Sequence, residues 1–160
     1  MEVGAFVGMK IWGLALALAL GLAAPGLADE LIGARGFVAH TYVKRTKGQA
    51  FRFSSPQLLA PDLYQLVQLD GGRRLIYDPL CQCKDNDGLS AEILSVTGTS
   101  RLAVAHVRLR FDGIATVQHV TLMVTRSAAG WKITDIRSSQ IPSLKAWLAQ
   151  KSGGVPIAQR

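Results

Sequence analysis

Both cysteines of the chain lie in the segment YDPLCQCKDNDG, where one residue separates Cys81 from Cys83. A thiol redox site usually has two intervening residues and an electropositive setting, whereas this spacing is shorter and the neighbouring side chains are acidic. A structural zinc site needs four ligands, and two cysteines do not complete one. A calcium loop counted back from Gly88 would begin at Cys83 and close at Leu94, so both ends lack the required oxygen ligand. The segment therefore predicts a rigid turn with no metal.

Two histidines are the next candidates for site chemistry. The Asp-Gly pair at positions 112–113 predicts a two-residue turn, which puts His106 directly opposite His119 on adjacent strands. Two imidazoles at that spacing are able to share a transition metal or to respond to pH as a pair. Two ligands do not make a metal site, however, and an inert pair is the third interpretation.

An enzymatic site would need a general base, and Asp135 is the candidate that the sequence offers. Its partner would be Tyr42 or His40, both on the first predicted helix. The sequence contains no Gly-x-Ser-x-Gly elbow, no His-Glu-x-x-His motif and no glycine-rich loop that opens a helix after a strand. We therefore expect no cofactor and favour a function without catalysis.

The first 28 residues have the pattern of a secretory signal peptide. Lys10 ends a short leading region, residues 11–24 form an apolar run, and small residues precede the bond between Ala28 and Asp29. The run is shorter than the roughly 20 residues that cross a bilayer, which disfavours an uncleaved anchor. We expect cleavage at this bond and a periplasmic or secreted protein that does not span the membrane.

Export also bears on the two cysteines, because disulfides persist in oxidising compartments. We favour a bond between Cys81 and Cys83, with free thiols or a disulfide to a second chain as the alternatives. Extending the chain-entropy model to a loop of about three residues gives a stabilisation of ~1.6 kcal/mol at most.

The pattern after the signal peptide predicts one α+β domain, residues 29–150, and a flexible tail, residues 151–160. Helical signals cover residues 29–48, 61–69 and 142–150. Period-two apolar patterns cover residues 89–96, 102–111, 116–126 and 131–137, and short links separate them. We expect N-terminal helices packed on an antiparallel four-stranded meander, followed by a short C-terminal helix.

The hairpin register divides the sheet into two faces. One predicted face is mostly apolar and is expected to lie under the helices; it contains Ala103, Ala105, Val107, Val120 and Leu122. The other carries Val104, His106, Arg108, Val117, His119 and Thr121. A structural homodimer would bury Val104, His106, Val117 and His119.

The chain has a formal net charge of +7, and its basic residues are scattered. Such a protein is attracted to anionic lipid headgroups, acidic polysaccharides or acidic proteins, although a merely solvated positive surface is the simpler interpretation. Export and the absence of interleaved aromatic residues argue against nucleic acid as the partner.

The chain resembles a family of exported bacterial proteins of unknown function, domain-of-unknown-function family 3828, with a nuclear-transport-factor-2-like (cystatin-like) fold. The matching positions are Asp78, Pro79, Asp85 and Asp87 in the loop, Trp131, Ile133, Asp135 and Ile136 in the last strand, and Ser143, Leu144 and Leu148 in the last helix. The resemblance implies a curved sheet that wraps around helices to form a cone, often with a pocket at its open end. It implies no particular activity, since this fold serves enzymes and binding modules alike.

These observations favour an exported, non-catalytic binding or interaction module for a small ligand or a protein partner. An accessory role in the envelope and toxin neutralisation are the two settings considered. The alternatives are a small enzyme that uses the cone as its pocket and a structural homodimer.

Overall fold

The structure, a computed structural model, describes residues 26–46 and 53–150. Most of the predicted signal segment and all of the predicted tail lie outside the described residues. In chain order the elements are α1 (Gly26–Thr46), α2 (Pro61–Asp70), β1 (Leu89–Gly98), β2 (Leu102–Phe111), β3 (Ile114–Ser127), β4 (Gly130–Ser138) and α3 (Leu144–Ala149). The predicted cleavage point after Ala28 falls near the start of α1.

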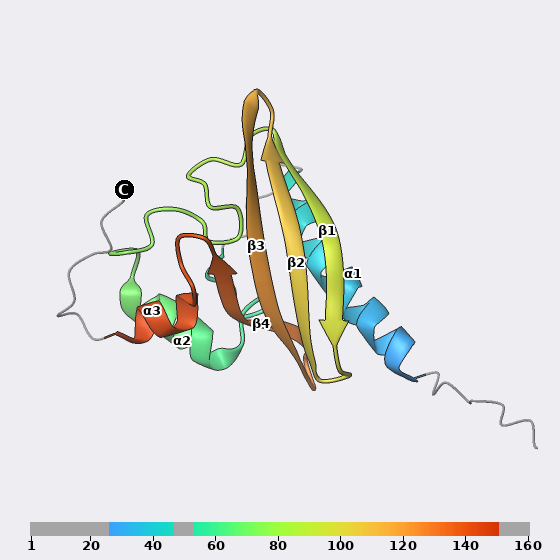
Figure 1. The fold of residues 1–160 in the computed structure, drawn as a ribbon. Helices are drawn as coiled ribbons and strands as arrows, with labels where there is room; N and C mark the ends of the chain where they lie inside the picture. Colours follow the sequence, from blue (N-terminus) through green and yellow to red (C-terminus); the bar gives the residue numbers. More distant parts are fainter. Residues whose placement is uncertain (1–25, 47–52, 151–160) are drawn as a thin grey trace, which may run out of the picture.

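The four strands form one antiparallel sheet in the order β1-β2-β3-β4, so each strand pairs with the next one in the chain. Short links suffice for this arrangement, because neighbouring antiparallel strands need only a tight turn between them. Figure 1 shows α1 crossing behind β1 and β2, while α2 and α3 lie together on the side of β4. The predicted α+β architecture, with helices, a four-stranded meander and a short closing helix, is confirmed.

The central hairpin turns where the Asp-Gly pair predicts it. Phe111 lies opposite Ile114, and Gly113 between them has a φ of 73°, a backbone conformation that glycine adopts without steric cost. β2 then alternates: Ala103, Ala105, Val107 and Leu109 are fully buried, and the residues between them are half-buried or exposed. The sheet therefore has one face against the helices and one open face.

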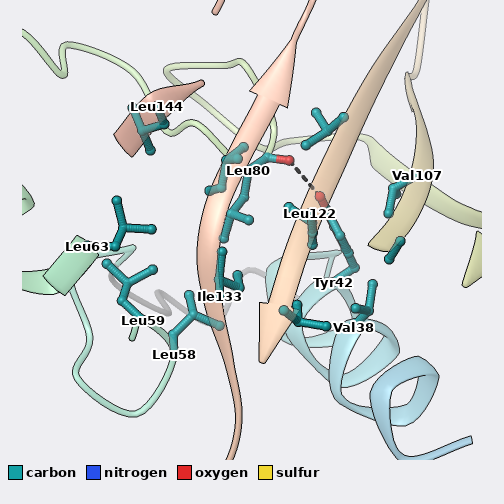
Figure 2. Packing of buried hydrophobic residues seen from close by; sticks show 14 of the residues in the cluster. Val38, Tyr42, Leu58, Leu59, Leu63, Leu80, Val107, Leu122, Ile133 and Leu144 are labelled. Carbon is teal, nitrogen blue, oxygen red and sulfur yellow. Dashed lines mark hydrogen bonds between the residues drawn. The ribbon is translucent and has the colours of Figure 1, made fainter. Parts of the chain in front are cut away.

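Apolar side chains fill the space between the sheet and the helices. Figure 2 shows leucines of the α2 region beside Ile133, and Val38 and Tyr42 of α1 near Leu122. The largest side chains that are fully buried here are Leu58, Leu59, Leu63, Leu80, Leu109, Leu122, Ile133, Ile136 and Leu144. The family resemblance implies a cone whose interior lies between the sheet and the helices. In the structure, leucine, isoleucine and valine side chains fill that interior.

A single arginine joins α2 to α3. Arg74 Nε donates to Asp70 Oδ1 at 2.7 Å, and its terminal nitrogens donate to the carbonyl oxygens of Leu148 at 2.9 Å and Trp147 at 3.2 Å. The guanidinium carbon lies 5.0 Å from the centroid of the Trp147 ring, within the range of a cation–π contact. These carbonyls belong to the last turn of α3, which lacks helical donors. We call this set of contacts the Arg74 clamp.

The carboxylate of Asp70 is buried, and both of its oxygens accept hydrogen bonds. Asp70 Oδ2 accepts the backbone N–H groups of Arg74 at 3.0 Å and Leu75 at 3.2 Å. Burial alone would raise the pKa of Asp70, but the hydrogen bonds from Arg74 and Leu75 outweigh it and hold the pKa below its usual value. The folded state therefore favours the charged carboxylate.

Candidate binding site

The structure gives Asp135, the proposed general base, a structural role. Its carboxylate is buried; Oδ1 accepts the backbone N–H groups of Ile136 at 2.9 Å and Lys145 at 3.0 Å. Oδ2 accepts from Arg137 Nε at 3.3 Å. Because Lys145 lies in the first turn of α3, Asp135 fixes the start of that helix against β4, in the way that a capping carboxylate does.

The two proposed partners of Asp135 lie on α1 and have other neighbours. The Tyr42 hydroxyl is buried and donates to the carbonyl oxygen of Leu80 at 2.9 Å. His40 is exposed and lines an open cavity of about 500 Å³ with Thr41, Gln57 and Trp131, among others. The contacts of Asp135 and Tyr42 thus anchor two different parts of the fold, α3 and the cysteine loop.

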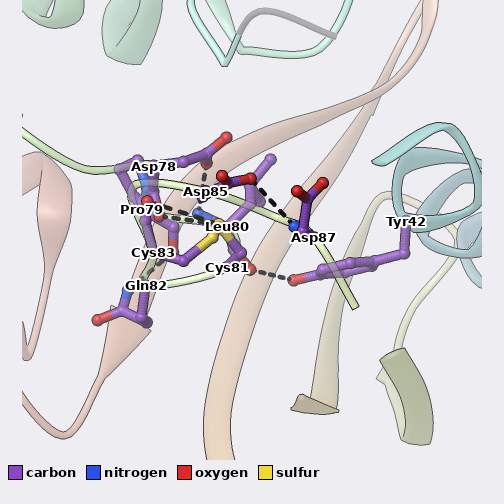
Figure 3. The surroundings of a disulfide bond; sticks show 9 residues. All are labelled: Tyr42, Asp78, Pro79, Leu80, Cys81, Gln82, Cys83, Asp85 and Asp87. Carbon is purple, nitrogen blue, oxygen red and sulfur yellow. Dashed lines mark hydrogen bonds between the residues drawn. A yellow bond between two sulfur atoms is a disulfide. The ribbon is translucent and has the colours of Figure 1, made fainter. Parts of the chain in front are cut away.

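The cysteine loop is closed by a disulfide between Cys81 and Cys83, as Figure 3 shows. The backbone N–H of Asp78 donates to the carbonyl oxygen of Cys83 at 2.8 Å, and Asp78 Oδ1 accepts the N–H of Leu80 at 2.9 Å. Gln82, between the cysteines, has a φ of 56°, a region that non-glycine residues rarely adopt. The predicted disulfide is present, and Asp78 and Pro79 belong to the turn that it closes.

The acidic end of the loop also forms a turn. Asp85 Oδ1 accepts the backbone N–H of Asp87 at 3.1 Å, the pattern of an Asx turn. Across residues 26–46 and 53–150, no three histidine, cysteine, aspartate or glutamate side chains gather where they would hold a metal ion. The loop motif of the family resemblance therefore contributes local hydrogen bonds to the fold.

Replacing both cysteines with alanine is expected to lower the free energy of unfolding by about 1–2 kcal/mol, because the disulfide restricts only a short loop of the unfolded chain. Urea unfolding of the oxidised protein and of the double variant would measure the difference. A loss as large as that expected for a long-range disulfide, or no loss at all, would contradict this assignment. Alkylation with and without reductant, followed by intact-mass measurement, would check the bond directly.

The predicted histidine pair was wrong in its register. His106 lies opposite Thr121, and its Nδ1 is 3.1 Å from Thr121 Oγ1, while His119 lies opposite Arg108. The cause is an irregularity in the pairing between Leu109 and Phe111, which shifts all later partners by two residues. A shift of two keeps each side chain on its predicted face, so both histidines still lie on the open face.

The open face carries arginines on β2 and β4, and a histidine on each of β2 and β3. Arg108 and Arg110 alternate along β2 on this face, and Arg137 of β4 lies opposite Thr121, which is opposite His106. Adjacent strands are about 4.8 Å apart, so these side chains of β2, β3 and β4 lie within reach of one extended ligand. This cluster of Arg108, Arg110, Arg137, His106 and His119 is named the basic face below.

One exposed carboxylate interrupts the basic face. Glu92 of β1 lies opposite Arg108 and accepts from its Nε at 3.0 Å. The hydrogen bond from Arg108, with the charges of Arg108 and Arg110, holds the pKa of Glu92 below its ordinary value, against a smaller opposing effect of desolvation. Glu92 is exposed, and the pair with Arg108 is therefore accessible to a competing anion.

Sequence reasoning found part of this face. The predicted hairpin places Arg108 on this face, and Arg110, two positions later on the same strand, shares it. Arg137 was not singled out, because its position beside Thr121 depends on a bulge between β3 and β4 near Met123. Glu92 has no distinguishing sequence signal and is identified only by its contact with Arg108.

A second open cavity, of about 440 Å³, lies beside the C-terminal end of α2. Phe53, Val67, Leu75 and Tyr77 line it, and burial raises the pKa of the Tyr77 hydroxyl. Both cavities thus lie at the border of the filled core. In the described residues, no helix is long and apolar enough to cross a membrane.

No family model matches the chain, and no curated protein matches it. Among solved structures, the chain is similar to a phospholipid-binding protein from Ralstonia solanacearum, solved in complex with a phospholipid. The two are 18% identical, the match covers 76% of this chain and 72% of that chain, and the TM-score is 0.38. We draw no functional conclusion from a similarity of this size.

Proposed function

We propose that the protein is an exported, non-catalytic binding module that binds a polyanionic surface through its basic face. The observation that carries the proposal is the open side of the sheet, where Arg108, Arg110 and Arg137 outnumber the carboxylates that contact them, the exposed Glu92 and the buried Asp135. The two candidates for catalysis have structural contacts instead, which favours a binding role. Asp135 accepts from the first turn of α3, and Tyr42 donates to the cysteine loop.

The chemistry of the partner follows from the arginines. A guanidinium presents a planar fork of donors that matches carboxylate, phosphate and sulfate groups. Several such forks spread over one face of a sheet suit a surface with repeated anionic groups better than one small anion. The shared chemistry is therefore a phosphate-, sulfate- or carboxylate-bearing surface, such as anionic lipid headgroups or an acidic polysaccharide.

The proposed setting is the bacterial envelope, as the sequence pattern of residues 1–28 and the oxidised cysteine pair both suggest. An accessory role there would bring the basic face to acidic lipid or polysaccharide, whereas toxin neutralisation would require an acidic protein. Intact mass of the exported protein tests the setting: we expect an N-terminus at Asp29. A protein that retains residues 1–28 would contradict cleavage at this site.

Binding of the purified mature protein to two probes tests the function. One probe is a vesicle with and without anionic phospholipid; the other is dextran sulfate, a soluble polyanion. We expect binding to at least one anionic probe, weaker binding at higher salt, and none to the uncharged vesicle. Equal binding to charged and uncharged vesicles, or binding to neither anionic probe, would overturn the proposal, and the preferred probe identifies the source of the anion.

Replacing Glu92 with glutamine is expected to strengthen binding to the anionic probe about two- to fivefold at low salt, since the change removes the exposed negative charge of the basic face and frees Arg108. Titration by fluorescence or sedimentation of the vesicles would measure the affinity. Asp87→Asn is the matched control, because it removes the same charge from the exposed cysteine loop. An equal gain in both variants would point to net charge alone and contradict a localised basic face.

A further inference from the structure

Part of β3 has no neighbouring strand on one side. The pairing of β3 with β4 runs from Ser127 opposite Gly130 to Val120 opposite Ser138 and ends there. Figure 1 shows β3 continuing well past the end of β4 toward the hairpin turn. Within the parts of the chain that the structure describes, no strand pairs with this side of residues 114–119. We call this stretch the 114–119 edge.

β2 also leaves part of the backbone of this edge without a pairing partner. Between the pairs Leu109–Gln118 and Phe111–Ile114, three residues of β3 face Arg110 alone. A bulge of this kind leaves the extra residues without ladder partners. Two apolar side chains of the 114–119 edge are exposed as well, Ile114 by 58% and Val117 by 39%. The 114–119 edge therefore presents both backbone donors and acceptors and apolar side chains to a partner.

The outer edges of β1 and β4 each have a local contact from another segment. On β1, Arg35 Nη2 from α1 donates to the carbonyl oxygen of Ile93 at 3.3 Å, next to a bulge. On β4, the segment before α2 pairs with Ile133: Ile133 N–H donates to Leu58 O at 2.9 Å, and Ala60 N–H donates to Ile133 O at 2.8 Å. Proteins protect strand edges with covering segments, charges or prolines. Residues 114–119 contain no lysine, arginine, aspartate, glutamate or proline.

We propose that the 114–119 edge pairs antiparallel with the same edge of a second copy of this chain. Two chains with a net charge of +7 repel each other, so a contact between copies is favoured where the surface carries no charge. An edge strand that meets itself about a two-fold axis forms a closed, isologous contact. This inference does not depend on the proposed function.

The geometry of such a pair has a consequence for the basic face. A two-fold axis perpendicular to the sheet leaves each side chain on its own face, so the open faces of both copies lie on the same side. Two four-stranded sheets then form one continuous sheet, with both sets of Arg108, Arg110 and Arg137 directed to one partner. Linked sites of this kind increase avidity without any new contact to the ligand.

Sedimentation velocity over a range of concentrations tests the pairing. We expect a reversible monomer–dimer equilibrium that shifts toward dimer as salt rises from about 50 to 500 mM, because salt screens the repulsion between two cationic chains. Thr116→Lys places a charge within the edge and should raise the dissociation constant tenfold or more. Thr97→Lys, on exposed β1, adds the same charge elsewhere and should have at most a small effect.

Two results would overturn the proposal: a protein that is monomeric at every concentration and salt, or an equal effect of the two lysine substitutions. Hydrogen exchange of the unmodified protein gives a test that needs no variant. Backbone amides of residues 114–119 should exchange more slowly as the dimer forms, while those of β1 should not change. Dimer formation without that protection would place the contact elsewhere and would also overturn the proposal.

Discussion

Replacing Arg74 with alanine is expected to lower the free energy of unfolding by about 3 kcal/mol, the lower end of the loss found when one partner of a buried ion pair is removed, because Asp70 is buried while Arg74 is 32% exposed. Asp70 would remain buried without its counter-ion, and the carbonyl oxygens of Trp147 and Leu148 would lose their donor. Urea or thermal unfolding monitored by circular dichroism would measure the change. Of the single substitutions considered, this one has the largest expected effect on stability.

The neighbouring arginine supplies the control for this experiment. Arg73 donates to the carbonyl oxygens of Asp70 and Leu69 but has no carboxylate partner among the ion pairs described, and it is exposed. Arg73→Ala should cost less than about 1 kcal/mol, as for most exposed contacts. In the double variant Asp70→Asn/Arg74→Ala, the combined loss should fall short of the sum of the single losses, because no buried charge is left unpaired. Additive losses would contradict the clamp.

The clamp also predicts how stability depends on pH. Because the folded state lowers the pKa of Asp70, the stabilisation is fully present above the pKa of an unfolded aspartate, about 3.9. It is lost as the pH falls from there through the lower pKa of the folded state. The Arg74→Ala variant should lose less stability than the unmodified protein over this acid range, and unfolding measured at several pH values would show it.

Replacing both Arg108 and Arg110 with glutamine is expected to weaken binding to anionic vesicles about thirtyfold, since each basic residue near such a surface contributes about 1 kcal/mol. The change also leaves Glu92 without its partner, so the middle of the face would become negative. Vesicle co-sedimentation at low salt would measure the affinity. The variant should also show a weaker dependence on salt than the unmodified protein.

Lysine substitutions separate charge from geometry in the same assay. Arg108→Lys/Arg110→Lys keeps the charge and should retain most of the binding to a lipid surface. Binding to a partner that needs the planar guanidinium should remain weak in this variant. Lys84→Gln removes a cation from the exposed cysteine loop and should have little effect. If Lys84→Gln weakens binding by half as many kcal/mol as the double arginine change, each lost charge has the same effect. Net charge would then govern binding, and the basic face would not.

The architecture could be predicted from the sequence because its signals are local. Period-two alternation identifies the strands, and the Asp-Gly pair fixes the central turn, where Phe111 lies opposite Ile114. The alternation also gives the buried face correctly. None of these signals depends on residues far away in the chain.

The register beyond that turn could not be predicted in the same way. The chain leaves three residues of β3 opposite Arg110, and this irregularity moves His119 from His106 to Arg108. No residue type at these positions indicates a bulge, since glycine and proline are both absent from residues 114–119. A histidine pair inferred from strand numbering alone therefore fails, although the face of each histidine is right.

The roles of the buried carboxylates were also beyond local reasoning. Asp70 has no local sequence signal of its role, because its partner Arg74 reaches α3 more than seventy positions later in the chain. Asp135 is the candidate general base in the sequence because an enzymatic site would need such a group and Asp135 is available for it. In the structure the same carboxylate accepts the N–H of Lys145, because the chain turns back there into α3.

The contacts of α1 have a consequence for the order in which the chain becomes structured. Tyr42 donates to Leu80, Arg35 donates to Ile93, and Gly33 lies so close to Trp131 that a Cβ there would be 3.2 Å from the indole nitrogen. Isolated helices are marginally stable in water, so α1 depends on partners that are synthesised 38 to 98 residues later. α1 lies mainly against β1, so a chain cut short before Leu89 should leave it unpacked, and the contact of Gly33 with Trp131 of β4 forms last.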